Sequence, residues 1–218
     1  RAAFDMQYCC FPHVTADVLT GRKPASALRA EHEKQAAEGL SGARFLRSTD
    51  NHDTANDQYD NRLEKQNSAG MEAALALCFL LDGVPFLYNG QEIADSRRHS
   101  IFINRFHGGN AGIDWSNAVT AAGKARMEFI RRMIRLRRSN PALTGGETVW
   151  LDNPCPDSLL TFRREGAEET LTVAVNLGST GRTVPLAGGP ILASGGNAFR
   201  SSEECVELPP YSFLVCRA

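Results

Sequence analysis

The residues best equipped for chemistry form one polar cluster around position 50. Its members are Asp50, Asn51, His52, Asp53, Asn56, Asp57 and Asp60. A histidine next to a carboxylate can face one pocket, where both side chains hydrogen-bond neighbouring hydroxyl groups of a sugar. The same composition is typical of a solvated loop in which Asp and Thr cap a helix. A sugar-binding site and a capping loop are therefore both consistent with the cluster.

The cluster also contains part of a calcium-binding pattern. Counted from Asp53, the oxygen-bearing residues Asp57, Asn61 and Glu64 occupy ligand positions of an EF-hand loop. Ala55 and Gln58 stand where such a loop needs a ligand and a turn glycine. A calcium-binding module would require Asp53, Asp57 and Glu64 to converge on one ion.

Strands and helices alternate on both sides of the cluster. The patterns predict strands at 2–8, 44–49 and 84–88 and helices at 25–39 and 68–81. Strands separated by helices indicate parallel pairing, which brings the carboxyl ends of the strands to one edge of a sheet. Residues 51–53 and 89–92 each follow a predicted strand, so we expect ligand chemistry where these two segments meet.

The pattern changes after Asn140-Pro141, where short strands punctuated by Gly, Pro and Asn begin. Strands are predicted at 148–151, 159–164, 170–176, 182–186, 191–194, 205–208 and 211–216. Their spacing is typical of an antiparallel sandwich, with a hairpin turn at Gly166. The alternation of Leu171, Val173 and Val175 places these apolar side chains on one face. A second domain is therefore expected after the helix predicted at 120–138.

Charge and composition exclude several classes of function. The 24 basic and 25 acidic residues of this 218-residue chain provide no field for nucleic acid or an anionic membrane. The arginines of the 120–138 helix concentrate near its C-terminus, and we interpret them as a solvated face that complements the helix dipole. The longest apolar stretch, 73–81, is shorter than the ~20 residues of a membrane span. The sequence begins at Arg1 and is expected to start at a processed or cropped boundary, so it indicates no compartment.

Three segments resemble the alpha-amylase family of glycoside hydrolases. Residues 45–54 (FLRSTDNHDT) resemble the motif at the end of that family's seventh barrel strand, and residues 83–93 (GVPFLYNGQEI) its eighth-strand motif. Residues 131–143 (RRMIRLRRSNPAL) are similar to the last barrel helix. The resemblance implies the C-terminal part of a (β/α)8 TIM barrel, strands 6 to 8, in residues 1–143. It implies an antiparallel β-sandwich domain in residues 144–218.

The resemblance also implies roles for individual residues. Asp53 matches the carboxylate that stabilises the transition state, and His52 matches the histidine that binds the same sugar. Asn51 completes the motif in a supporting role. Gly90 and Glu92 match positions that shape the eighth-strand loop. Hydrogen bonds that strengthen as the oxocarbenium ion forms lower the barrier to glycoside cleavage.

The implied activity is retaining hydrolysis of alpha-glucosidic bonds in an alpha-glucan or maltooligosaccharide. In the family, the nucleophile and the acid/base residue lie on the fourth and fifth strands, ahead of the first residue here. We therefore expect a segment of a longer enzyme, inactive alone, whose partner is the remainder of the barrel. No metal or cofactor is implied for these residues, and any calcium would belong to the rest of the protein. A non-catalytic carbohydrate-binding or scaffold relative is the alternative, and the motifs leave open the bond cleaved and hydrolysis versus transglycosylation.

Overall fold

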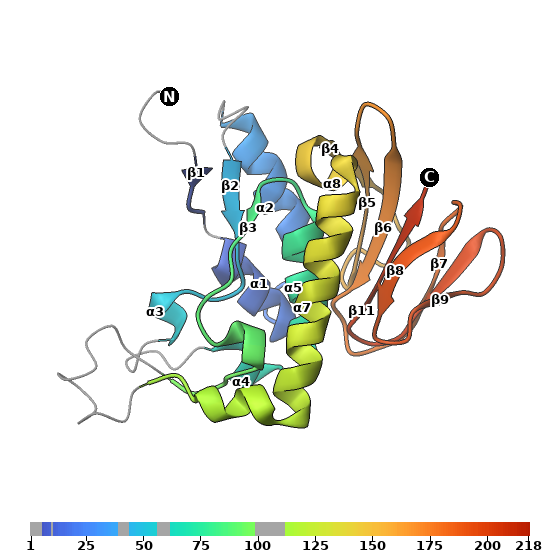
Figure 1. Ribbon diagram of the computed structural model, residues 1–218. Coiled ribbons are helices and arrows are strands. Elements are labelled where there is room, and N and C mark those ends of the chain that lie inside the picture. Colours follow the sequence, from blue (N-terminus) through green and yellow to red (C-terminus); the bar gives the residue numbers. More distant parts are fainter. Residues whose placement is uncertain (1–5, 10, 39–43, 56–61, 99–111) are drawn as a thin grey trace.

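The computed structural model describes residues 6–9, 11–38, 44–55, 62–98 and 112–218. Helices and a small parallel sheet occupy one side of the molecule, and antiparallel sheets occupy the other (Figure 1). The chain crosses from the first side to the second after the long helix α7 (Ala121–Ser139).

The parallel sheet contains the short strands β1 (Met6–Gln7), β2 (Arg44–Arg47) and β3 (Val84–Pro85), paired in that order. Met6 pairs with Arg44 and Leu46 pairs with Val84, both in parallel register. The parallel pairing predicted from the alternation of strands and helices is confirmed, although all three described strands are shorter than predicted. Residues 2–5 of the first predicted strand lie outside the described residues.

Besides α7, the described residues form several shorter helices. They are α1 (Phe11–Leu19), α2 (Ser26–Ala37), α3 (His52–Ala55), α4 (Leu63–Gln66), α5 (Met71–Leu80), η1 (Gln91–Ile93), η2 (Trp115–Val119) and α8 (Pro141–Gly145). The predicted helices at 25–39, 68–81 and 120–138 correspond to α2, α5 and α7. Helix α1 was not predicted, because its β-branched residues favour strands and only the burial of one face stabilises it as a helix.

Helix α5 is buried on every side except at Glu72. It contacts β3 and α7, and it also contacts two strands of the antiparallel sheets, β6 (Thr170–Asn176) and β11 (Ser212–Arg217). A helix covered on all sides is apolar all round, which explains the uninterrupted run Ala73–Leu81. The same hydrophobic core therefore includes the helices and one face of the antiparallel sheet that contains β6 and β11.

The antiparallel part has two sheets. One has the order β4-β5-β6-β11-β8 and the other β7-β10-β9. The remaining strands are β4 (Glu147–Leu151), β5 (Leu159–Glu165), β7 (Arg182–Pro185), β8 (Ile191–Gly195), β9 (Phe199–Arg200) and β10 (Cys205–Leu208). Leu171, Val173 and Val175 of β6 face the helices, whereas Ala174 faces a second core. The predicted one-sided alternation is confirmed, and Gly166 forms the predicted turn through its N–H to the Glu169 carbonyl oxygen, at 2.9 Å.

A partly buried polar network joins the helical side to β4. The Trp150 indole N–H donates to Nδ1 of His32 at 3.3 Å, and Nε2 of His32 lies 2.7 Å from an Asp82 carboxylate oxygen. Because an indole nitrogen only donates, the proton of His32 resides on Nε2, which donates to Asp82. Arg47 donates to the same carboxylate at 3.0 Å. The network fixes α2, β2 and β4 relative to one another.

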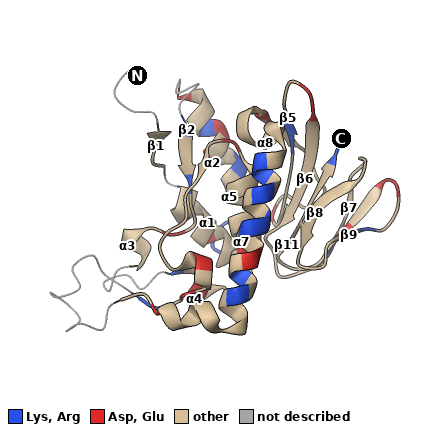
Figure 2. Ribbon diagram, in the orientation of Figure 1, with Lys and Arg blue, Asp and Glu red and all other residues tan. Residues whose placement is uncertain are grey.

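The arginines of α7 correct one interpretation of the sequence. Basic residues occur along the length of this helix (Figure 2). Arg126 and Arg137 are buried rather than solvated. Arg126 binds Glu64, at 2.7 and 3.1 Å, and Arg137 donates to the carbonyl oxygens of residues 79, 81 and 83. These two guanidinium groups satisfy buried acceptors on neighbouring elements, which a sequence pattern does not reveal.

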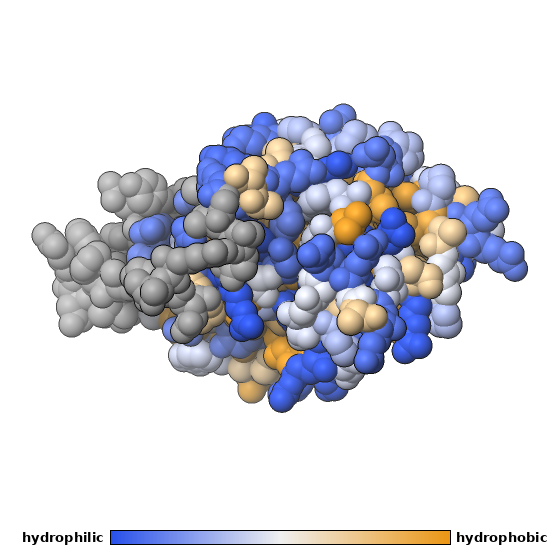
Figure 3. Space-filling view, turned by 90° about the horizontal axis from the view of Figure 1, so that it is seen from above, coloured by the Kyte–Doolittle hydropathy of each residue, from blue (hydrophilic) through white to orange (hydrophobic). Residues whose placement is uncertain are grey.

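The described surface is mixed in polarity. Seen from above, hydrophobic residues form small groups separated by hydrophilic ones (Figure 3). Among the described helices, none combines the length and apolarity needed to cross a membrane.

Candidate functional site

The polar cluster begins directly after β2, at the carboxyl end of the parallel sheet. Thr49 and Asp50 are buried, and Gln91, which follows β3, donates to both of them, at 2.6 and 3.3 Å. Gln91 also accepts from the backbone N–H of Tyr88 at 2.8 Å. The segments that follow the two strands therefore meet at one edge, as the parallel arrangement predicts.

Asn51 caps the short helix α3. Its side-chain oxygen accepts the backbone N–H groups of Asp53 and Thr54, at 2.8 and 2.9 Å. Its side-chain nitrogen donates to the Tyr8 hydroxyl at 2.5 Å, and the residue is 5% exposed. Both the oxygen and the nitrogen of the Asn51 side-chain amide are thus hydrogen-bonded within the protein. Asn51 therefore holds the backbone of the residues that follow it in place.

His52 and Asp53 face outward from this support. Their side chains are 55% and 61% exposed, and His52 Nε2 lies 3.4 Å from Asp53 Oδ1. An imidazole and a carboxylate side by side at the surface offer both donor and acceptor atoms to a hydroxylated ligand. The structure therefore brings the three predicted site residues together, with Asn51 buried beneath the two exposed side chains.

Asp50 anchors the base of the loop. Its carboxylate accepts from the Thr54 hydroxyl at 3.1 Å and from the Leu63 backbone N–H at 3.3 Å. The Arg62 guanidinium lies 3.3 Å from it. Burial raises the pKa of Asp50, and the Arg62 charge and the hydrogen bonds oppose this shift only in part. Asp50 is therefore a structural carboxylate, distinct from the accessible Asp53.

A cavity of about 470 Å³ opens beside Asp53. Its polar lining includes Thr54 from α3, His13 and Asp17 from α1, and Gln66 from α4. Sequence reasoning missed His13 and Gln66, because neither α1 nor α4 was predicted. The spacing of Phe11, Thr15, Val18 and Leu19, with Gly21 shortly beyond them, was the available sequence signal for α1. The cavity gives the exposed carboxylate a recess whose polar side chains can bind hydroxyl groups.

The loop after β3 has the architectural geometry that was expected of it. Gly90 adopts φ +92°, a conformation that favours glycine. The Glu92 carboxylate accepts the Gly90 backbone N–H at 2.9 Å. Glu92 thus stabilises its own turn.

The calcium interpretation is wrong for Glu64. Arg126 binds both oxygens of the Glu64 carboxylate, and Glu64 is 8% exposed. Asp57 lies outside the described residues. Across the described parts of the chain, there is no group of three or more His, Cys, Asp or Glu residues that could hold a metal ion.

Comparisons with known proteins point to one family. No family model matches the chain. Alpha-amylase 2 of Dictyoglomus thermophilum is 30% identical over 102 residues, which cover 45% of this chain and 17% of that protein. The structure of AmyP in complex with maltose has a TM-score of 0.74 at 16% identity, covering 99% of this chain and 50% of AmyP. Isomaltulose synthase from Klebsiella sp. LX3 has a TM-score of 0.71 at 14% identity, with 98% and 51% covered.

These findings agree with the three motifs. The chain resembles the C-terminal part of alpha-amylase-family enzymes in both sequence and fold. It spans about half of the two solved structures and less than a fifth of the curated relative.

Proposed function

We propose that this chain is the C-terminal part of an alpha-amylase-family glycosidase, in which Asp53 stabilises the transition state. The complete enzyme would hydrolyse alpha-glucosidic bonds of starch-like oligosaccharides with retention of configuration. The observation that carries the proposal is the exposed His52–Asp53 pair, held at the carboxyl end of a parallel strand by Asn51. Active sites of barrel enzymes lie at this end of the strands.

In this proposal, residues 1–143 supply barrel strands 6 to 8 as β1, β2 and β3, and residues 144–218 form the β-sandwich domain. The parallel order of these strands and the two antiparallel sheets support the assignment. Three strands do not close an eight-stranded barrel. On the edge strand β1, Met6 is 49% exposed, and Tyr8 beyond it is 44% exposed. The remainder of the barrel is therefore the proposed partner of this edge.

The proposed mechanism divides the work between two parts of the enzyme. A nucleophilic carboxylate and an acid/base carboxylate, about 5 Å apart, act from the other barrel strands. Asp53 and His52 bind hydroxyl groups of the sugar at the cleavage point. An ionised Asp53 stabilises that sugar most strongly as positive charge develops on it, and this difference lowers the barrier. The Asn51 cap holds the Asp53 backbone in place before the sugar binds.

The test is Asp53→Asn in the full-length protein. We expect turnover of maltooligosaccharides to fall by about two orders of magnitude or more, because a neutral amide removes the charge that favours the transition state. Asp152→Asn is the matched control, since this carboxylate is 98% exposed and lies beyond β4. Turnover unchanged by Asp53→Asn would remove this residue from the mechanism.

The chain of 218 residues gives a second test. Purified alone, it should hydrolyse neither starch nor maltooligosaccharides, because the nucleophile belongs to the proposed remainder of the barrel. Clear hydrolysis by the purified chain would contradict this division. A non-catalytic carbohydrate-binding relative would bind maltooligosaccharides in full-length form without cleaving them.

Sugar transfer is a second candidate reaction, because a protein named as a synthase shares this fold. Transfer and hydrolysis differ in whether a sugar or water attacks the glycosyl-enzyme intermediate. Analysis of the full-length enzyme's products distinguishes them. A net increase in the number of reducing ends indicates hydrolysis, whereas transfer leaves that number unchanged and yields a rearranged or lengthened saccharide.

A further inference from the structure

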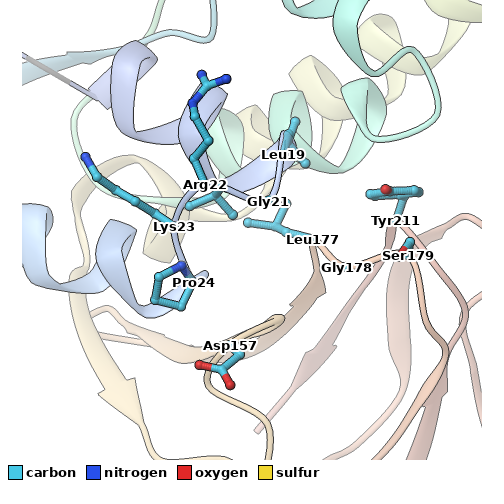
Figure 4. A pocket seen from close by; sticks show the side chains of 11 residues that line it. Leu19, Gly21, Arg22, Lys23, Pro24, Asp157, Leu177, Gly178, Ser179 and Tyr211 are labelled. Atoms are coloured by element: carbon cyan, nitrogen blue, oxygen red, sulfur yellow. The ribbon is translucent and has the colours of Figure 1, made fainter.

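A second cavity, of about 390 Å³, lies where the segment after α1 meets the antiparallel sheets. In the view of Figure 4, the cavity has Arg22, Lys23 and Pro24 on one side and Ser179 and Tyr211 on the other, and Asp157 lies at its lower edge. Its floor is apolar and contains Val18, Leu19 and Leu177. No role assigned above involves this cavity.

Three polar side chains at this cavity are available to a ligand. The Asp157 carboxylate and the hydroxyls of Ser179 and Tyr211 form no side-chain hydrogen bond with other described residues. Asp157 and Ser179 are exposed, and Tyr211 is half-buried with its ring against the hydrophobic core. The cavity thus combines an aromatic ring, an apolar floor and unpaired oxygen atoms.

The charges at the cavity favour a neutral ligand. Arg22 and Lys23 each lie 2.8 Å from the carboxylate of Asp17, which binds both. The Asp157 carboxylate adds a second negative charge, so two cations face two anions. A phosphate or another anion would have to compete with these carboxylates for the cations. A neutral ligand with many hydroxyl groups and one apolar face, such as a pyranose, meets no such competition.

Backbone contacts hold the two sides of the cavity in fixed positions. The backbone N–H of Ala25 donates to the Asp157 carbonyl oxygen at 2.8 Å, and the N–H of Ser26 donates to the Pro156 carbonyl oxygen at 2.9 Å. Tyr211 adopts φ +52° and donates its own N–H to the Gly178 carbonyl oxygen at 3.1 Å. Little backbone freedom on these two sides is therefore lost when a ligand binds.

The cavity is next to the proposed active site. Arg22 lines both this cavity and the cavity beside Asp53. The two recesses therefore adjoin at this residue. A ligand long enough to pass over Arg22 would occupy both.

We propose that this second cavity binds a remote part of the same alpha-glucan chain whose reacting bond lies at Asp53. This inference rests on the function proposed above and adds that the enzyme prefers long glucans to short ones. Asp157, Ser179 and Tyr211 are its specificity-determining residues. Their contacts stabilise only those substrates that reach beyond Arg22.

The test compares two substrates of different length in the full-length protein. The measured quantity is the ratio of kcat/KM for maltoheptaose to kcat/KM for maltotriose. In the double variant Asp157→Ala/Ser179→Ala this ratio should fall about tenfold, the loss expected for one or two net hydrogen bonds. Tyr211→Phe, which keeps the ring and removes the hydroxyl, should lower the ratio by a smaller factor. Asp152→Ala, an exposed aspartate outside the cavity, should leave it unchanged.

An unchanged ratio in the double variant overturns the inference, and so does an equal fall in kcat/KM for both substrates. If the full-length protein cleaves neither substrate, the proposed function fails, and isothermal titration calorimetry with maltoheptaose then decides the inference separately. A Kd about tenfold weaker in the double variant than in the wild type supports the second site. Equal Kd values, or no binding by the wild type, overturn it.

Discussion

Replacing Asn51 with alanine tests the support beneath the candidate site. Three hydrogen bonds are lost: two from the backbone N–H groups of Asp53 and Thr54, and one to the Tyr8 hydroxyl. Asn51→Asp is the matched variant, because a carboxylate still accepts both backbone N–H groups. Its other oxygen would accept from the Tyr8 hydroxyl, which reverses the direction of the bond that Asn51 donates.

The expected magnitude follows from these contacts. Loss of a helix N-cap costs about 1 kcal/mol, and loss of the bond to Tyr8 costs about 1 kcal/mol more. Asn51→Ala should therefore lower the free energy of unfolding by about 2 kcal/mol, which corresponds to a fall in Tm of roughly 4 to 8 °C for a chain of this size. Asn51→Asp should cost less than half as much.

Urea denaturation measures both differences, and hydrogen exchange locates them. The amide protons of Asp53 and Thr54 should exchange faster in Asn51→Ala than in the wild type, because their acceptor is gone. A loss of less than about 0.5 kcal/mol in Asn51→Ala would refute the capping argument. An Asn51→Asp variant as unstable as Asn51→Ala would refute it as well.

Three further predictions concern the framework of the fold. Arg126→Met leaves the Glu64 carboxylate buried without its partner and should lower the free energy of unfolding, measured by urea denaturation, by about 3 to 5 kcal/mol. The double variant Arg126→Met/Glu64→Leu should recover most of that loss. Equal losses in the two variants would contradict the argument. Burial acts to raise the pKa of Asp82, but the hydrogen bond from His32 and the nearby charges outweigh it and hold the pKa below its usual range. The ionised carboxylate therefore contributes stability above about pH 4, and this contribution is lost as the pH falls through the folded-state pKa. The difference in unfolding free energy between wild type and Asp82→Asn should be largest near neutral pH and should shrink in acid. A difference that does not depend on pH would contradict this argument. Gly83→Ala should lower Tm by several degrees, because Gly83 has φ +88° and an added Cβ would lie 2.3 Å from the Phe45 carbonyl oxygen. An unchanged Tm would be inconsistent with this geometry.

Much of the local structure was predictable because its cause is local. The apolar run Ala73–Leu81 indicated a buried helix, and α5 is that helix. The alternation in β6 indicated a strand with one face in the core. Parallel strands bring their carboxyl ends to one edge, so the meeting of the segments after β2 and β3 followed from strand order.

The partners of buried polar groups were not predictable in this way. Asn51 donates to Tyr8, 43 positions earlier, and Arg126 binds Glu64, 62 positions earlier. The arginines of α7 therefore looked like a solvated face, although Arg126 and Arg137 are buried. Charge and periodicity do not distinguish a buried paired cation from an exposed one.

By itself, the sequence determined the order of the elements, the three family-like motifs and the position of Asp53 after a strand. Only the tertiary structure decided that Asp53 is exposed while Asp50, three residues earlier, is buried beside Arg62. It also decided that His13 and Gln66 line the cavity beside Asp53, and that Arg22 lines both this cavity and the one at Tyr211. Strands and helices follow from propensities and periodicities read along neighbouring residues, whereas exposure and cavities depend on which distant segments pack together.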